Sequence, residues 1–264
     1  MSDWTIRSLY CGYTSGGIPT AKKEWAIPFM NYYLTDGHMK VLVDTGVRDG
    51  YIKGGKSGWG YPTVGGAEYV TKGLSEVGAT PADIDMVIYT HFHWDHVGNC
   101  HLFPRATHIF QDDEWKEMVD PLPCMDDYLV YDKPVIDELR KLKLQRVVGD
   151  VELLDGVELL HSPGHSAGHQ CVRVKTQKGH YIITGDLVNT YWMAYPKWTE
   201  WVLLNGTVTT IDPEVAWWMR TLFLVTIYDN YAWHRSQYRI KALAGERKFL
   251  IPSHDASVLN KTFG

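Results

Sequence analysis

Short apolar runs that end in polar residues recur along the chain and predict strands followed by loops. Residues 40–46 form one such run, which closes with Asp-Thr-Gly, and residues 84–90 form a second run typical of a buried strand. Between them, residues 67–79 have the apolar spacing of an amphipathic helix. The first half of the chain therefore alternates strands with helices.

The same alternation continues further along, with a stretch rich in strands. Residues 107–119 predict a strand and then a helix that begins near Asp112, and residues 131–144 carry another helix. The later strands are expected at residues 156–165, 170–177, 180–186 and 248–255. This pattern predicts an α+β protein whose sheets are covered by helices. We expect one domain over residues 1–264, with two similar halves that join near residues 145–155.

Composition narrows the class of protein. The net charge is −5 and no basic run stands out, which argues against a nucleic-acid-binding protein. No apolar run approaches the ~18–20 residues that span a bilayer, and the N-terminus does not resemble a secretory signal. The four cysteines form no CxxC pair and favour reduced, buried thiols in a cytoplasmic protein: Cys11, Cys100, Cys124 and Cys171.

Three histidines and one aspartate crowd into the six positions from His91 to His96, where a predicted strand ends. Residues two apart on an extended chain point the same way, so His91 and His93 converge on one point. Asp95 and His96, in the following turn, can face a second point nearby. Neutral imidazole and carboxylate are the ligands that borderline divalent metals prefer. Because burying such groups is costly unless something pairs with them, the motif predicts metal binding.

One short motif cannot close two metal sites, so further ligands are expected at other strand ends. The polar residues at those ends are His161, His165 and His169 in a Gly-rich loop, Asp186, His254 and Asp255. Pro163, Gly164 and Gly168 argue against a helix in that loop. Spacing alone does not choose among its three histidines.

Taken in order, THFHWDHVGN, PGHSAGH, TGD and PSHD, with LVDTG upstream, resemble the motifs of the metallo-β-lactamase superfamily. Within it, the chain looks most similar to the N-acyl-homoserine lactonase group. The resemblance implies a four-layered αβ/βα sandwich with two metal ions in a cleft between two sheets. It also implies that one metal is bound by His91, His93 and His169, that the other is bound by Asp95, His96 and His254, and that Asp186 bridges them. It places His161 and His165 outside the ligand set and Asp44 beneath the site as a support.

Two cations ~3.5–4 Å apart can share a water, lower its pKa toward neutrality and clamp an attacking and a leaving oxygen. We therefore expect a hydrolase in which a bridging hydroxide attacks the carbonyl of a lactone, with Asp95 passing the proton to the leaving oxygen. We expect two divalent metal ions per chain, with zinc as the default, although manganese, iron or cobalt suit the same ligands. The same ligand set would also suit an esterase, a thioesterase or a cyclic amidase. The alternative from a different functional class is a non-catalytic metal-binding protein.

The substrate is expected to be a small cyclic ester, either an N-acyl-homoserine lactone or an aromatic or bicyclic lactone. The known lactonases resembled here place a tyrosine three residues after the bridging aspartate, whereas this chain has Asn189, with Tyr191 nearby. No cysteine stands at a ligand position, unlike the best-known β-lactamases, and the C-terminal helical extension of glyoxalase II has no counterpart. A quorum-quenching type of lactonase fits the motifs best.

An aromatic-rich insertion is expected at about residues 190–230, and six tryptophans lie in its region. These side chains either pack the insertion onto the core or roof the metal cleft, with Trp192 and Trp198 as the foremost substrate contacts. Residues 24–33 are expected to add a second wall. The tryptophans could equally line a homodimer interface, so the sequence leaves the oligomeric state open.

Overall fold

The computed structural model describes residues 3–15, 26–123, 125, 130–195, 197–211 and 228–264. Its larger sheet has eight strands, and β4 (Thr63–Val64) pairs with β1 off the main path. The main path runs β15 (Thr262–Phe263), β1 (Thr5–Ser15), β2 (Ala26–Thr35), β3 (Lys40–Val43), β5 (Met86–Ile88), β6 (Thr107–Gln111) and β7 (Lys143–Val147). Strands β3, β5, β6 and β7 are parallel.

A smaller sheet has five strands, in the order β14 (Leu250–Ile251), β11 (Gly179–Ile183), β10 (Gln170–Thr176), β9 (Val157–His161) and β8 (Val151–Leu154). Strands β8 to β11 are antiparallel to one another, and β14 pairs with β11 in parallel. The chain passes from the larger to the smaller sheet between Val147 and Val151, and β15 returns it to the larger sheet at the end.

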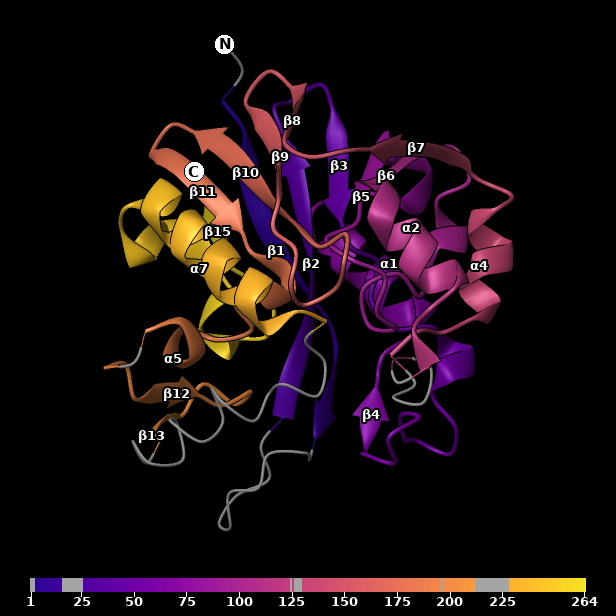
Figure 1. The fold of residues 1–264 in the computed structure, drawn as a ribbon, viewed down its shortest axis with the longest axis horizontal. Coiled ribbons are helices and arrows are strands. Elements are labelled where there is room, and N and C mark those ends of the chain that lie inside the picture. Colours follow the sequence, from indigo (N-terminus) through magenta and orange to yellow (C-terminus); the bar gives the residue numbers. More distant parts are fainter. Residues whose placement is uncertain (1–2, 16–25, 124, 126–129, 196, 212–227) are drawn as a thin grey trace.

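Helices cover the outer face of each sheet (Figure 1). Helices α1 (Ala67–Glu76), α2 (Asp112–Val119) and α4 (Pro134–Leu139) lie on the side of the larger sheet, and α7 (Asn230–Ala244) lies against the smaller sheet. Side chains of both sheets share one buried cluster, for example Val41 and Ile109 from the larger sheet with Val172 and Ile182 from the smaller. The result is helix, sheet, sheet, helix: the four-layered αβ/βα sandwich implied by the resemblance to the metallo-β-lactamase superfamily.

Most of the elements expected from the apolar pattern are present, and α2 begins at Asp112 as predicted. The long strands β1 and β2 had no counterpart among the predictions. Strand β2 is buried along most of its length, so it shows no alternation of apolar and polar residues. A small aromatic-rich unit follows β11: α5 (Tyr191–Ala194) and the hairpin of β12 (Glu200–Val202) and β13 (Val208–Thr210). The remainder of the expected insertion, residues 212–227, lies outside the described residues.

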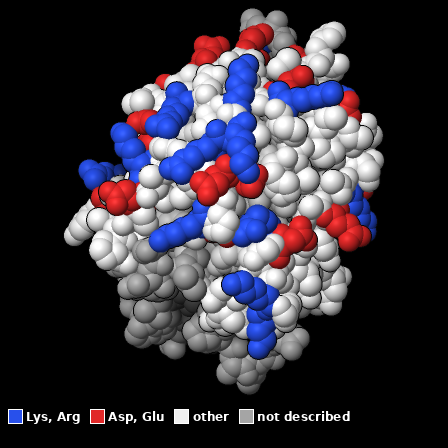
Figure 2. Space-filling view, turned by 90° about the vertical axis from the view of Figure 1, so that its right-hand side faces the viewer, with Lys and Arg blue, Asp and Glu red and all other residues white. Residues whose placement is uncertain are grey.

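Charged side chains on the face over α2 and α4 are interspersed rather than gathered by sign (Figure 2). Several of them pair locally: Lys116 lies 2.9 Å from Asp112, and Lys141 lies 3.0 Å from Glu138. Cys11, Cys100 and Cys171 are buried and unpaired, as expected, and Cys124 lies outside the described residues. Within the described part of the chain, no helix is both long and apolar enough to cross a membrane.

Candidate metal centre

Polar residues of the sequence motifs meet at one end of the two sheets. His91, His93, Asp95 and His96 follow β5 of the larger sheet, and Asp44 follows the neighbouring β3. The smaller sheet contributes His165 from the loop between β9 and β10, Asp186 after β11 and His254 after β14. Because parallel neighbouring strands place their carboxyl ends at the same edge, loops far apart in sequence converge here.

The first group of donor atoms comes from His91, His93 and His165, whose ligand atoms lie within 4.8 Å of one another. His165 Nε2 is 2.9 Å from His93 Nδ1, and the two rings meet at a centroid distance of 4.6 Å. The bond to His165 uses the far nitrogen of His93 and leaves the buried His93 Nε2 without a hydrogen-bond partner among the described residues. His169 also borders this group, because its ring lies 5.3 Å from that of His91. Its Nδ1 is 2.9 Å from Ser162 Oγ, and its buried Nε2 has no hydrogen-bond partner among the described residues. The assignment of His169 rather than His165 as a metal ligand stays a prediction.

Packing against α7 fixes the course of the Gly-rich loop at Gly164. Gly164 has a positive φ of 134°, and a Cβ there would lie 2.2 Å from the backbone nitrogen of Trp233 in α7. Only glycine therefore allows this approach. The contact involves a helix about 70 residues further along the chain, so the spacing of the histidines within the loop does not reveal it.

The second group comes from Asp95, His96 and His254, whose ligand atoms also lie within 4.8 Å of one another. Asp95 Oδ2 is 3.7 Å from His96 Nε2 and 3.6 Å from His254 Nε2. Asp186 lies between the two groups. Its Oδ1 is 3.0 Å from His254 Nε2, and its Oδ2 is 3.4 Å from His165 Nε2.

Hydrogen bonds to the far nitrogen of several imidazoles fix the orientation of the rings. His96 Nδ1 donates to Asp44 Oδ2 at 2.8 Å, and His254 Nδ1 donates to the carbonyl of Pro28 at 2.8 Å. His91 Nδ1 is 3.0 Å from Thr90 Oγ1. Each bond leaves the Nε2 lone pair facing the centre, which is the usual arrangement behind a metal-bound histidine.

The donor set fits divalent metal ions. The Nε2 atoms of His91, His93 and His169 are buried and have no hydrogen-bond partner among the described residues, which is costly unless a cation completes them. Burial lowers the pKa of His91 and His165 well below its usual value, and lowers that of His93 to about 3. These three imidazoles are therefore neutral near pH 7, the form that binds metals.

The second group carries negative charge. Burial lowers the pKa of His96, but the carboxylates of Asp95, Asp186 and Asp44 outweigh that effect and raise it well above the usual value. For Asp186, burial alone would raise the pKa of the carboxyl. The nearby His254 and His96 outweigh this effect and bring the pKa of Asp186 well below its usual value. The centre thus combines neutral imidazoles with ionised carboxylate, and a cation would satisfy both.

An aromatic cluster beside Asp95, which the sequence did not reveal, is formed by Phe29, Tyr51, Trp59 and Trp94. Tyr51 stacks on Trp94 at 4.7 Å with an interplanar angle of 9°, and Trp59 meets Trp94 edge-on at 5.7 Å. The ring of Phe29 lies 5.3 Å from that of Trp94 and 6.1 Å from that of His254. Trp59 is 39% exposed, so the cluster reaches the surface. Only Phe29 falls within the segment expected to form a wall.

The expected substrate contacts differ in their placement. Asn189 is partly exposed and its Nδ2 lies 3.4 Å from Asp186 Oδ2, so its amide is at the centre. Tyr191 points elsewhere, because its hydroxyl donates to the carbonyl of Leu250 at 2.8 Å within the core. Trp192 is buried against Trp201 at 5.7 Å, and Trp198 stacks under Arg247 at 3.7 Å. These contacts fit the packing role considered for the tryptophans.

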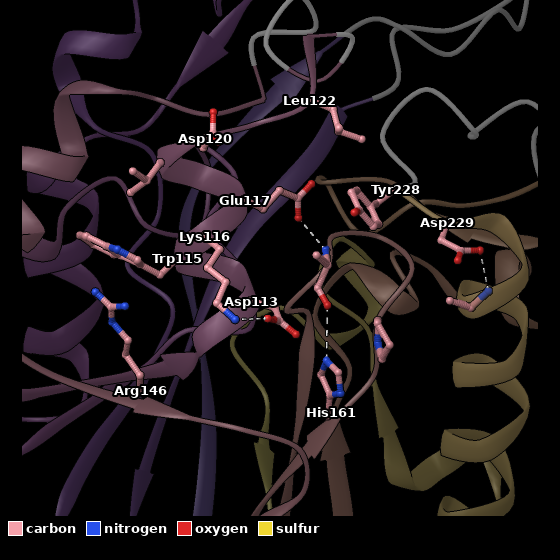
Figure 3. Close-up of a pocket in the computed structure, with 14 residues that line it drawn as sticks. Asp113, Trp115, Lys116, Glu117, Asp120, Leu122, Arg146, His161, Tyr228 and Asp229 are labelled. Carbon is pink, nitrogen blue, oxygen red and sulfur yellow. Dashed lines mark hydrogen bonds and ion pairs between the residues drawn. The ribbon is translucent and has the colours of Figure 1, made fainter.

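A surface pocket lies on the outside of the Gly-rich loop, between α2 and the start of α7 (Figure 3). Glu117 lines it and accepts a hydrogen bond from Ala167 N at 2.6 Å, and His161 Nε2 lies 3.3 Å from Ala167 O. The structure therefore places His161 on this side of the loop, whereas His165 belongs to the group formed with His91 and His93.

Comparison with known families and proteins agrees with this geometry. A family model described as the metallo-beta-lactamase superfamily matches residues 31–210. An N-acyl homoserine lactonase from a Bacillus species is 31% identical over 168 residues, which are 61% of this chain and 64% of that protein. The N-acyl homoserine lactonase AttM of Azorhizobium caulinodans is 27% identical over 208 residues, which are 72% of this chain and 74% of that one. The chain thus spans just under two thirds of the Bacillus relative.

Solved structures share the fold over nearly the whole chain. A structure of an N-acyl homoserine lactone hydrolase with the product N-hexanoyl-L-homoserine bound at its catalytic metal centre aligns with a TM-score of 0.70 at 23% identity, covering 97% of this chain and 94% of the other. A probable metal-dependent hydrolase from Staphylococcus aureus aligns with a TM-score of 0.70 at 21% identity, covering 97% and 90%. At these identities the likeness concerns the fold.

Proposed function

The chain belongs to the metallo-β-lactamase superfamily, and we propose that it is a dinuclear metallohydrolase that opens the ring of a lactone. The observation that carries this proposal is the position of Asp186 between two groups of donor atoms. One carboxylate that faces both groups suits a pair of ions rather than a single one. The lactonases among the relatives favour a cyclic ester as the substrate class.

In this proposal the ions would be held by side chains from both sheets. His91, His93 and His169, whose buried Nε2 atoms have no other partner among the described residues, would hold the first ion. Asp95, His96 and His254 would hold the second, with Asp186 shared. Zinc is the ion we expect, because imidazole and carboxylate in this number suit it, although the same ligands accept other borderline metals.

Two such ions, when bound, would lower the pKa of a water and stabilise the attacking and leaving oxygens of a displacement. The net reaction adds water to the lactone carbonyl carbon, breaks the bond from that carbon to the ring oxygen, and leaves a hydroxy acid. Asp95 is the partly exposed carboxylate of the set, so we assign to it the transfer of the proton from the water to the departing ring oxygen. Asn189 stands where its amide can donate a hydrogen bond to an oxygen of the substrate.

The aromatic cluster narrows the substrate further. Phe29, Tyr51, Trp59 and Trp94 form an apolar wall that leads from Asp95 and His254 to the surface. A wall of this kind suits an acyl chain or an aromatic ring attached to the lactone. We therefore propose a lactone with an apolar substituent, with N-acyl-homoserine lactones as the first class to examine.

The test combines metal analysis with a substrate panel. The panel contains N-butanoyl- and N-decanoyl-L-homoserine lactone, an aryl-substituted lactone, the matching open-chain ester and thioester, and the matching lactam. We expect about two ions per chain, acid release from lactones, loss of turnover on chelation and recovery on adding zinc. Activity confined to the ester, thioester or lactam would replace the lactonase assignment with that hydrolase. Full metal content without turnover on any of them would contradict a hydrolytic role.

A further inference from the structure

A fully buried carboxylate, Glu114, connects the two histidine-bearing segments without belonging to either. It lies in the first turn of α2 and is 0% exposed. Its Oε1 accepts a hydrogen bond from the backbone nitrogen of Phe92 at 2.7 Å. Its Oε2 accepts from Ser166 Oγ at 2.5 Å and from the backbone nitrogen of Gly168 at 3.1 Å. The three donors use both oxygens of a single side chain.

The donors lie next to the residues that form the first group. Phe92 stands between His91 and His93, Ser166 directly follows His165, and Gly168 directly precedes His169. The carboxylate therefore connects the backbone of one ligand segment to the loop that carries the remaining ligand, across a sequence separation of more than 70 residues. Both loop histidines border the strand end: His165 Nε2 is 2.9 Å from His93 Nδ1, and the His169 ring is 5.3 Å from that of His91.

The loop is pressed against α2 at the same point. A Cβ at Gly168 would lie 2.1 Å from the backbone nitrogen of Glu114 and 2.6 Å from its Cβ, so only glycine allows this approach. On its other side the loop meets α7 at Gly164. The Gly-rich loop is thus held between two helices, and Glu114 supplies its polar attachment to the strand end that bears His91 and His93.

We propose that Glu114 is a positioning residue that sets the spacing of His91, His93 and His169 for the first metal ion. This inference rests on the metal centre of the proposed function. A buried carboxylate is costly, and here it accepts three hydrogen bonds that no neutral side chain of the same size could accept together. Glutamine has one acceptor oxygen, so its NH₂ group would face either Phe92 N–H or the donors of the loop.

Glu117, one turn further along α2, offers a matched control. It is also buried and also holds the loop, but on the pocket side (Figure 3). Its Oε2 accepts from Ala167 N at 2.6 Å. The single oxygen of glutamine can accept this bond equally well. Glu117→Gln therefore makes the same chemical change on the same helix and against the same loop, without disturbing the connection to Phe92.

The experiment measures zinc affinity and the visible spectrum of the cobalt-substituted protein for the wild type, Glu114→Gln and Glu117→Gln. In Glu114→Gln we expect the affinity for the first ion to fall about 10- to 100-fold, as is typical when the groups behind metal ligands are altered. The cobalt bands of that site should change, whereas those of the second should stay. Glu117→Gln should bind both ions within about twofold of the wild type, since its hydrogen bond is retained.

Ser166→Ala provides a milder test should Glu114→Gln fail to fold. It removes one of the three hydrogen-bond donors. It should lower the affinity for the first ion by a smaller factor and leave the circular dichroism spectrum native. Wild-type affinity and unchanged cobalt bands in both Glu114→Gln and Ser166→Ala would overturn the proposal, as would an equal loss in Glu117→Gln. A wild-type protein that binds two ions but opens no lactone contradicts the proposed function and leaves this inference standing.

Discussion

Asp44 and His96 are joined by a hydrogen bond of 2.8 Å from His96 Nδ1 to Asp44 Oδ2. The same carboxylate also accepts from the backbone nitrogen and the hydroxyl of Thr90, both at 2.8 Å. Asp44 has a positive φ of 62°, which is uncommon for residues other than glycine. A strained backbone at a residue with three buried hydrogen bonds indicates that the surrounding structure holds Asp44 in place to orient His96.

Replacing Asp44 by asparagine separates the role of the carboxylate from that of the backbone. Asparagine tolerates a positive φ, but its amide has one acceptor oxygen for the three donors. We expect Asp44→Asn to lower the free energy of unfolding by about 2–4 kcal/mol, because buried donors are left unpaired. We also expect it to lower the affinity for the second ion, because His96 loses its orienting carboxylate. Urea unfolding and metal titration would measure both. Asp36→Asn, in an exposed turn, is the control and should change stability by less than about 0.5 kcal/mol.

Variants of the two loop histidines discriminate between the ligand assignments. We expect His169→Ala to bind about one ion per chain, because the first ion loses a ligand, and His165→Ala to retain about two. Atomic emission spectroscopy on dialysed protein would measure the metal content. The reverse result, with metal lost only in His165→Ala, would overturn the assignment of His169 as a ligand.

Asp95 tests the chemical step. Asp95→Asn should fold normally and lose activity by a factor on the order of 100 to 10,000, the usual contribution of a proton-transferring group. The measurement is lactone turnover with both ions loaded, and circular dichroism checks the fold. A rate within threefold of the wild type at full metal content would remove Asp95 from the mechanism.

The aromatic cluster predicts a chain-length effect. Trp59→Ala should raise KM for N-decanoyl-homoserine lactone about tenfold, equivalent to ~1.4 kcal/mol, because it removes exposed apolar surface at the outer end of the wall. KM for the N-butanoyl compound should change little. Tyr238→Ala, at an exposed position on α7, is the control for loss of an aromatic surface residue. Equal changes in KM for both substrates would place the acyl chain elsewhere.

His108 predicts a pH dependence away from the metal centre. It is buried on β6, where Nδ1 accepts from the Tyr89 hydroxyl at 2.9 Å and Nε2 donates to the carbonyl of Phe103 at 3.0 Å. Burial lowers its pKa below the usual value, so the unfolded chain takes up the proton first. The stability that neutral His108 contributes is complete above pH ~6.5 and is lost as the pH falls below that value.

The comparison that isolates this effect is with His108→Gln. The difference in unfolding free energy between the wild type and this variant should shrink as the pH falls from 7 to 5, with a slope of up to about 1.4 kcal/mol per pH unit. Urea unfolding at several pH values measures it. A difference that stays constant or grows on acidification would contradict the prediction.

Local spacing at a strand end predicted the group from His91 to His96, whereas the four layers were predicted only through the resemblance to the metallo-β-lactamase superfamily. Spacing did not show how the Gly-rich loop is held, since that depends on contacts of Gly164 with α7 and of Gly168 with α2. It also missed the cluster around Trp94, whose members come from three distant segments. Tyr191 was considered as a substrate contact because it lies close to Asp186 in sequence. Its side chain instead points into the core, where its hydroxyl donates to the carbonyl of Leu250.

The ligands of each proposed ion come from both sheets, so a bound ion cross-links the two halves of the sandwich. The free energy of ion binding then adds to the free energy of unfolding of the whole protein, because the unfolded chain cannot hold these side chains together. Metal starvation in a cell would consequently shorten the lifetime of the polypeptide as well as slow its catalysis. Proteolytic half-life and catalytic rate would then depend on the same free-ion concentration.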